Sequence, residues 1–273
     1  MPPSRSVESH HFEALGTSCS VFAVDQSRSR LLEGEFWVRR LGARLTRFSA
    51  DSELSKLNAA GGEWIEVSPE LESLLQASLT AFEASAGLVN VAVLQSMLAI
   101  GYARSFAEGP GAVAIEDARP LPSLPDVLNV RPGAARIKPG AGIDLGGIAK
   151  GWMADRLSEM LGPNSLANLG GDLRAAGPGP NGGGWPVGVA NATLMLRDQG
   201  AATSSVRRRR WAKVHHLIDP RTGLPAKSGL EEVSVVADTG FDAEVVAKTA
   251  LLLGPDLAPT YCAGHALAWW LSE

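Results

Sequence analysis

Two glycine turns enclose one helical segment between residues 143 and 174, and this unit constrains the fold more than any other part of the chain. An apolar run leads into Asp144 and Gly146-Gly147, a helical pattern carrying Lys150 follows, and a second apolar run ends at Gly170-Gly171. Glycines let the backbone approach a ligand closely, and the helix that follows presents free N–H groups to an anion. The same pattern is typical of a strand, turn, helix, turn, strand unit with glycine caps, so an anion site is one of two interpretations.

The first hundred residues show mainly helical spacing. A strand pair or bent strand is expected within residues 11–24, followed by an amphipathic helix over 30–48 and a short capped helix near 51–58. Ser68-Pro69-Glu70 is a strong helix start, because serine caps the end and proline fits the first helical position. A further helix is expected over residues 90–101, where apolar side chains cover one face broadly.

Strands dominate the later part of the chain. A hairpin is expected near residues 127–139 and a last helix over 242–253, and the antiparallel strands expected between them cover 185–190, 192–197, 212–219 and 230–238. Residues 105–125 are rich in proline, glycine and alanine and are expected to form a surface excursion, so that 1–273 is a single domain. With helices early, strands late and no βαβ alternation, the predicted class is α+β, an antiparallel sheet flanked by helices.

Composition excludes several classes of function. The net charge is −4, so no general attraction to nucleic acid or to an anionic membrane is expected. The basic run Arg207–Arg210 is either a solvated hairpin tip or a patch for a polyanion, and the first interpretation is favoured. Cys19 and Cys262 lie far apart and predict neither a zinc site nor a disulfide framework. The first 18 residues show no signal peptide or lipoprotein signal, and no apolar window reaches the ~18 residues of a membrane span, so a cytoplasmic location is expected.

Seven stretches, taken in order along the chain, resemble the ApbE family of flavin transferases. They are LGTSCSV from residue 15, FSADSELSKLN from 48, IDLGGIAKGWMADRL from 143, LANLGGDLRAAG from 166, ATSS from 202, HLIDPRTGLP from 216 and AEVVAKTALLLG from 243. The resemblance implies an α+β domain that moves FMN from FAD onto a threonine or serine of a target protein and releases AMP. It also implies FAD as substrate, an acceptor protein as partner, and Mg²⁺ at the pyrophosphate.

The resemblance also assigns site residues. The residues expected to contact FAD or to shape its pocket are Leu15, Phe48, Asn90, Asp144, Lys150, Gly171, Asp172, Ile218 and Asp219. His216 lies where the family has a histidine that could accept the proton of the incoming hydroxyl, and its ordinary pKa suits a base near neutrality. The alternative is a histidine in a sheet that makes only local hydrogen bonds.

The metal-ligand positions depart from the family pattern. By resemblance, Glu244 and Lys248 stand where the family has an aspartate and, four residues later, a threonine or serine, with Gly147 supplying a carbonyl. Glu244 could bind magnesium, but a charged lysine has no lone pair to offer. Either the Lys248 ammonium stands in place of the metal as a fixed cation, or Glu244 and Lys248 form an exposed ion pair and the metal site is lost. A shifted register would offer Asp242 and Thr249 instead.

Three functions therefore remain open. The favoured one is FMN transfer from FAD to a protein hydroxyl, with Lys248 and His216 in catalytic roles. The second is a catalytically inert FAD-binding or scaffold protein of the same fold. The third is an FAD pyrophosphatase, in which water takes the place of the protein acceptor.

Overall fold

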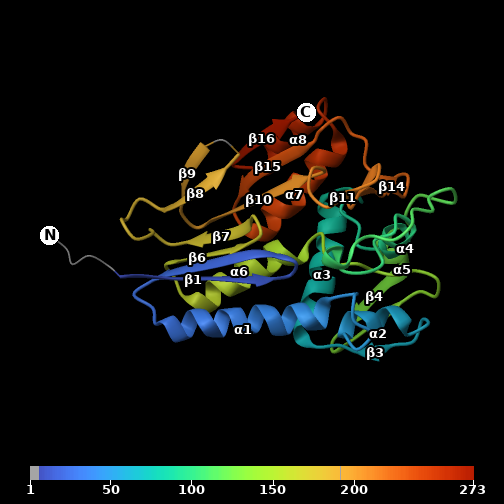
Figure 1. The fold of residues 1–273 in the computed structure, drawn as a ribbon, viewed down its shortest axis with the longest axis horizontal. Helices are drawn as coiled ribbons and strands as arrows, with labels where there is room; N and C mark the ends of the chain where they lie inside the picture. Colours follow the sequence, from blue (N-terminus) through green and yellow to red (C-terminus); the bar gives the residue numbers. More distant parts are fainter. Residues whose placement is uncertain (1–5, 191) are drawn as a thin grey trace.

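A seven-stranded antiparallel sheet forms the centre of the protein in the computed structural model, which describes residues 6–190 and 192–273 (Figure 1). Its strand order is β1-β2-β6-β7-β10-β15-β16, so the first and last strands of the chain lie at opposite edges. The strands are β1 (Val7–Ala14), β2 (Thr17–Val24), β6 (Ser165–Leu169), β7 (Asp172–Ala176), β10 (Gln199–Ser205), β15 (Glu232–Ala237) and β16 (Ala268–Ser272).

Tight turns set the register of two hairpins in this sheet. Leu15 and Gly16 both have positive φ, 55° and 68°, which places Ala14 opposite Thr17 between β1 and β2. Gly170 and Gly171 also have positive φ and pair Leu169 with Asp172 between β6 and β7. Two-residue turns of this kind match the twist of the flanking strands, so both glycine-containing motifs become hairpin ends.

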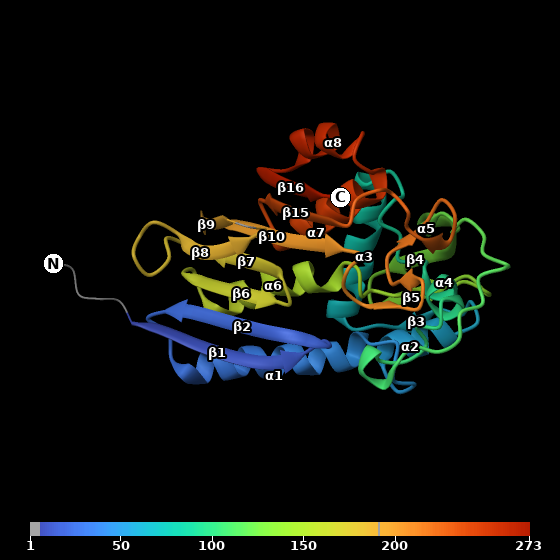
Figure 2. The same ribbon diagram turned by 45° about the horizontal axis from the view of Figure 1, so that its top comes forward.

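Three long helices pack against one face of the sheet: α1 (Arg28–Leu45), α6 (Ala149–Leu161) and α7 (Gly240–Leu253) (Figures 1 and 2). In α7 ten residues are buried, because the helix lies between α6, the sheet and α8 (Ala258–His265). Asp155 on α6 accepts hydrogen bonds of 2.7 and 2.9 Å from the N–H groups of Gly240 and Phe241 at the start of α7. This contact fixes the relative position of the two helices that carry Lys150, Glu244 and Lys248.

A second layer, in which most elements except α3 are short, lies at one end of the sheet (Figure 2). The helices here are α2 (Glu53–Ala59), α3 (Pro69–Ala84), α4 (Leu94–Ala99), the short η1 (Phe106–Glu108) and α5 (Leu124–Val127). They surround a three-stranded sheet of β3 (Ile65–Glu66), β5 (Ala134–Ile137) and β4 (Leu128–Arg131). On the other face of the main sheet lies a hairpin of β8 (Trp185–Val189) and β9 (Ala192–Leu196).

The predicted helix starts agree with the structure. Ser52 accepts a hydrogen bond of 3.0 Å from the N–H of Ser55, and Ser68 accepts one of 3.2 Å from Leu71. The helix predicted over 90–101 is wrong in extent, since α4 covers only Leu94–Ala99. The Asn90 side chain instead accepts from the N–H of Ala92 at 2.9 Å and holds a turn. None of the helices in the described ranges is long and apolar enough to cross a membrane.

The segment that follows α4 has little regular structure, as expected of a surface excursion. Between η1 and α5 the backbone forms neither helix nor strand, and most of its side chains are exposed. It is nevertheless anchored, because the N–H of Leu121 donates a 2.8 Å hydrogen bond to the carbonyl of Pro220. The continuous strand predicted over 212–219 is wrong as well, since the chain there forms the two-residue strands β12 (Val214–His215) and β13 (Ile218–Asp219), which pair with β11 (Arg210–Trp211) and β14 (Leu224–Pro225).

Candidate functional site

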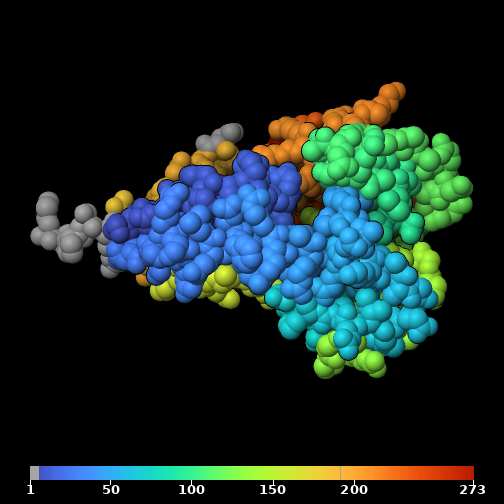
Figure 3. All heavy atoms as spheres, turned by 60° about the horizontal axis from the view of Figure 1, so that its bottom comes forward, coloured from blue at the N-terminus to red at the C-terminus, as the bar shows by residue number. Residues whose placement is uncertain are grey.

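A cavity of about 900 Å³ lies between the main sheet with its helices and the second layer. In the space-filling view the surface is hollowed between the blue first hairpin and the green segment after α4 (Figure 3). The lining comes from segments far apart in sequence. It includes the β1–β2 turn, the end of α1, the two glycine turns, the segment after β10 and one side of α7.

Most of the residues predicted for the site line this cavity. They are Leu15, Phe48, Asn90, Asp144, Gly147, Lys150, Asp172, His216, Ile218, Glu244 and Lys248. Gly171 and Asp219 lie beside the lining, which takes in their neighbours Gly170 and Ile218 instead. The Asp219 carboxylate is held by the Arg221 guanidinium at 2.7 Å, so that carboxylate does not face the cavity as an unpaired group.

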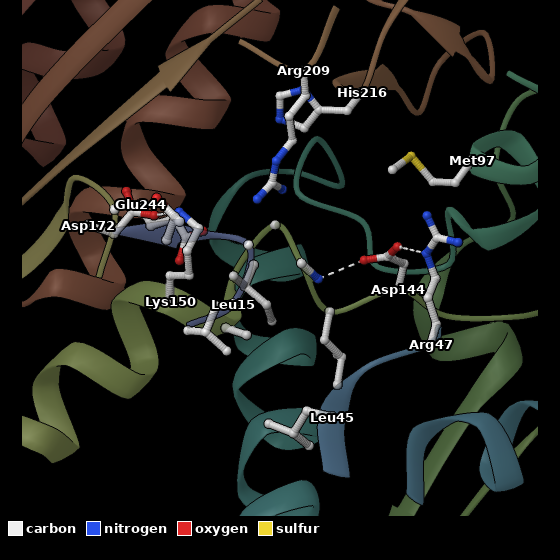
Figure 4. Close-up of a pocket in the computed structure, with 18 of the residues that line it drawn as sticks. Leu15, Leu45, Arg47, Met97, Asp144, Lys150, Asp172, Arg209, His216 and Glu244 are labelled. Atoms are coloured by element: carbon white, nitrogen blue, oxygen red, sulfur yellow. Dashed lines mark hydrogen bonds and ion pairs between the residues drawn. The ribbon is translucent and has the colours of Figure 1, made fainter. Parts of the chain in front are cut away.

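One wall of the cavity carries a set of paired charges (Figure 4). Lys150, in the first turn of α6, forms an ion pair with Asp172, the first residue of β7. The buried Glu244 on α7 accepts a 2.8 Å hydrogen bond from the N–H of Gly151. One turn further along α7, the Lys248 ammonium donates a hydrogen bond to the carbonyl of Gly147. The glycine turn before α6 and the face of α7 are therefore joined across the site.

Burial affects both of these lysines. It lowers the pKa of Lys150 and of Lys248, because a buried ammonium loses hydration, while the Glu244 carboxylate acts on both in the opposite direction. A dianion bound beside them would favour the charged forms further. This wall is thus suited to binding phosphate oxygens.

His216 lies in the cavity wall, and its Nδ1 is buried with no hydrogen-bond partner among the described residues. Burial, followed by the nearby charges of Arg209 and Lys248, lowers its pKa from 6.5 to about 3. The imidazole is therefore neutral at physiological pH. The adjacent His215 faces the core, where its Nε2 donates to the carbonyl of Ala226 at 3.0 Å and its Nδ1 accepts from the N–H of Leu217.

The opposite wall is aromatic and apolar around one ion pair. Arg47, whose side chain is 4% exposed, pairs with Asp144, and Asp144 also accepts a 2.7 Å hydrogen bond from the N–H of Gly146. The Arg47 guanidinium lies 4.3 Å from the ring centroid of Phe48 and 4.8 Å from that of Tyr102. This wall offers flat, mostly apolar surfaces beside a fixed charge.

Sequence reasoning did not find Arg47, Met97, Tyr102, Arg208 and Arg209, all of which line the cavity. The favoured interpretation of the basic run as a solvated segment holds in part, since Arg207, Arg208 and Arg210 are exposed, but two of its residues also line the cavity. Arg208 and Arg209 reach the cavity, and Arg209 points toward it beside His216 (Figure 4). The sequence feature that could have indicated Arg208 and Arg209 as site residues is the run of four arginines in a chain of net charge −4.

The cavity has an excess of positive charge although the chain as a whole is acidic. Among the described lining residues, six cationic side chains face three carboxylates: Arg39, Arg47, Lys150, Arg208, Arg209 and Lys248 against Asp144, Asp172 and Glu244. Such an excess inside a concave site attracts anions. The site therefore favours a polyanionic ligand.

The donor set does not fit a divalent cation. In the described parts of the chain no three His, Cys, Asp or Glu side chains come together as a metal site. The Gly147 carbonyl is occupied by the Lys248 ammonium, and Glu244 accepts from a backbone N–H. The shifted register gives no better set. Thr249 is buried and its hydroxyl donates to the carbonyl of Val245 at 2.8 Å, and the Asp242 carboxylate accepts a 2.6 Å hydrogen bond from the hydroxyl of Thr239, the N-cap of α7.

Together these features define an α+β protein in which the described residues form a cavity suited to an anionic ligand that also carries an apolar ring. The model of the ApbE family matches residues 15–269, and the chain belongs to that family.

Curated relatives and solved structures agree with this assignment. The chain is 29% identical over 237 residues to the FAD:protein FMN transferase of Treponema pallidum (strain Nichols), covering 75% of this chain and 66% of that protein. It is 28% identical to the FAD:protein FMN transferase of Klebsiella pneumoniae (strain 342), covering 80% of this chain and 72% of the relative. The chain thus spans roughly two thirds of the length of these relatives.

The fold is shared with solved structures at low identity. The ApbE protein of Thermotoga maritima superposes with a TM-score of 0.85 at 24% identity, over 98% of this chain and 97% of that one. The flavinyl transferase ApbE of Pseudomonas stutzeri gives a TM-score of 0.84 at 19% identity, over 98% and 93%. The predicted α+β class and the resemblance stated from the sequence are both confirmed.

Proposed function

We propose that this chain transfers FMN from FAD to a threonine or serine hydroxyl of an acceptor protein and releases AMP. The observation that carries the proposal is one cavity with two chemically different walls, cationic around Lys150 and Lys248 and aromatic around Phe48 and Tyr102. FAD combines a flat ring system with an anionic pyrophosphate and so matches both. The names of the family relatives support the same activity.

The charged wall suits the pyrophosphate. Lys150, Arg209 and Lys248 provide N–H donors that bind phosphate oxygens and stabilise the charge that develops on them as the bond to the leaving group breaks. Because Lys150 is held by its ion pair with Asp172 and Lys248 by its hydrogen bond to Gly147, these two lysines need little reorganisation when the substrate binds. Phe48, which is 43% exposed, offers stacking surface for a ring, and the buried Tyr102 packs against it.

The transfer forms one P–O bond and breaks another. The acceptor hydroxyl oxygen attacks the phosphorus on the FMN side of the pyrophosphate, the bond to the AMP phosphate breaks, and AMP leaves with the electron pair. His216 is the group that we propose takes the hydroxyl proton, since its imidazole is neutral and lines the cavity. The positive charges that lower its pKa would be offset by bound pyrophosphate, so the histidine becomes a stronger base in the complex.

The test is a transfer assay in which the purified chain is mixed with FAD and with a protein that the Klebsiella pneumoniae FAD:protein FMN transferase modifies. We expect covalent flavin fluorescence on the acceptor in a denaturing gel, and release of one AMP per flavin attached. His216→Asn should reduce the rate by about 100-fold or more, the usual contribution of a general base. His265→Asn, which changes an exposed histidine on α8, is the matched control and should keep the wild-type rate.

Two other outcomes would replace the proposal. FAD binding without AMP release would indicate an inert flavin-binding protein, and release of free FMN and AMP without acceptor would indicate a pyrophosphatase. The proposal also includes an acceptor protein with a flexible threonine- or serine-containing motif, as the family resemblance implies. A cytoplasmic location, expected from the sequence, is a further part of it.

A further inference from the structure

Lys248 holds a position in which an ammonium group is difficult to explain as a surface charge. Its side chain is part-buried on the cavity side of α7 and donates to the carbonyl of Gly147 in the turn that precedes α6. Glu244 lies one turn earlier on the same helix and is 5% exposed. The interpretation of these two residues as an exposed ion pair is therefore wrong.

The oxygen atoms around this position already have donors. Glu244 Oε2 accepts from the N–H of Gly151, the Asp172 carboxylate pairs with Lys150, and the Gly147 carbonyl accepts from Lys248. A divalent cation would need several of these oxygens at once and would meet the ammonium as a like charge. With Lys248 in place, each of these oxygen-bearing groups has a hydrogen-bond or ion-pair partner, and no divalent cation is needed to balance them.

We propose that the Lys248 ammonium takes the place of a divalent cation in this chain, so that FAD binding and FMN transfer require no Mg²⁺. The inference rests on the function proposed above. Lys248 provides one positive charge at the junction of the Gly147 turn and α7, and Lys150, Arg208 and Arg209 line the same cavity and supply further charge to the pyrophosphate. The lysine remains available to the ligand because an ammonium has three N–H donors, of which one is used by Gly147.

A covalently attached cation has a predictable advantage and a predictable cost. It cannot be removed by a chelator, and its contribution does not depend on the concentration of free Mg²⁺. A single ammonium also carries half the charge of Mg²⁺, and the surrounding lining has more cationic side chains than carboxylates.

The first test is FAD affinity, measured by calorimetry in excess EDTA and in excess MgCl₂. For the wild-type chain we expect dissociation constants that agree within about threefold, and no heat when MgCl₂ is added to the FAD complex. Lys248→Met keeps the length and packing of the side chain without the charge. In EDTA this variant should lose about 10- to 100-fold in affinity, the size expected for one charge-assisted hydrogen bond. Lys56→Met, an exposed lysine on α2, is the control and should bind as the wild type does.

Lys248→Thr separates the charge from the space that it fills. It frees the Gly147 carbonyl, removes the positive charge beside Glu244 and adds a hydroxyl oxygen, so Mg²⁺ should restore part of the lost FAD affinity in this variant but not in Lys248→Met. The wild-type comparison decides the inference even where a variant does not fold.

Two results would overturn the inference in different ways. FAD binding or FMN transfer by the wild type that is lost in EDTA and restored by MgCl₂ would refute the lysine's role and leave the transferase function standing. Absence of FAD binding in both buffers would refute the transferase function together with the inference.

Discussion

The ammonium of Lys248 and the main-chain carbonyl of Gly147 share a hydrogen bond although the two residues are 101 positions apart in the chain. One belongs to α7 and the other to the glycine turn before α6. Since Asp155 also ties α6 to the first residues of α7, the two helices are connected at both ends of their contact. Their relative position fixes Lys150, Glu244 and Lys248 in one wall of the cavity.

A methyl group at residue 147 should disturb this wall specifically. In Gly147→Ala the new Cβ would overlap with the Lys248 ammonium, which is the flexible end of its side chain and can move away. Gly147 does not have a positive φ, so no backbone strain is added. We expect a stability close to wild type, measured by urea unfolding, and a loss of FAD affinity of about tenfold, measured by calorimetry.

Gly188→Ala is the matched control for that change. Gly188 lies in β8 with open space around its Cβ position and without a positive φ. It should leave both FAD affinity and stability unchanged. An unaltered FAD affinity in Gly147→Ala would contradict the proposed role of the contact.

The pair of Arg47 and Asp144 should contribute strongly to stability. Their side chains are 4% and 13% exposed, and Arg47 Nη2 has no hydrogen-bond partner among the described residues. Asp144→Asn leaves a buried guanidinium without its anion, so the free energy of unfolding should fall by about 3 kcal/mol. Urea unfolding followed by circular dichroism measures this change.

Glu33→Gln provides the comparison, since it breaks the exposed pair of Arg30 and Glu33 on α1. It should cost less than about 1 kcal/mol. Equal losses in the two variants would show that burial of the Arg47 pair has no energetic consequence.

Local interactions explain which parts of the fold could be predicted from the sequence. Ser52 and Ser68 cap helices through bonds to residues three positions away, and Gly170-Gly171 makes a turn through its own φ angles. A pattern within one segment contains this information. The helix predicted over 90–101 is too long, because the Asn90 side chain binds the N–H of Ala92 and holds a turn there. The spacing of apolar residues contains no information about this hydrogen bond.

The residues of the candidate site also fall into those that a local sequence pattern predicts and those that only long-range packing brings together. Family motifs located Lys150, Asp172 and His216, and the structure brings all three to one cavity. Arg47 reaches that cavity from an irregular segment after α1, and Arg209 reaches it from the bend between β10 and β11, 162 positions later. Nothing in either segment indicates a contact with the other. Contacts over such distances depend on the packing of the whole sheet.

Both cysteines should resist modification in the folded protein. Cys19 is 3% exposed and Cys262 is fully buried, and burial raises the pKa of each thiol to about 11. At pH 8 only about one thiol in a thousand would be ionised, so reaction with a disulfide reagent should be slow until urea unfolds the chain. Ser18→Cys, which places a thiol at an exposed position of β2, should react at once. Rapid labelling of the folded wild type would contradict the buried positions.

His216 should make the stability depend on pH in a defined window. Its pKa is about 3 in the folded chain and lies near 6.5 when the chain is unfolded. Between these values the unfolded chain binds a proton that the folded chain does not, so the free energy of unfolding falls as the pH is lowered through this window. Above pH 6.5 neither state is protonated and the contribution disappears. At pH 5 the loss relative to neutral pH should be about 2 kcal/mol.

The measurement is urea unfolding of the wild type and of His216→Asn at pH 7 and at pH 5. The variant has no titrating group at this position, so its stability should fall by about 2 kcal/mol less than that of the wild type over this interval. His265→Asn removes an exposed histidine and should retain the wild-type pH dependence. If His216→Asn loses as much stability as the wild type, the imidazole is not held in its neutral form by the folded chain. The pKa of His216 would then be ordinary in the folded chain, and the lowering of that pKa by burial would be contradicted.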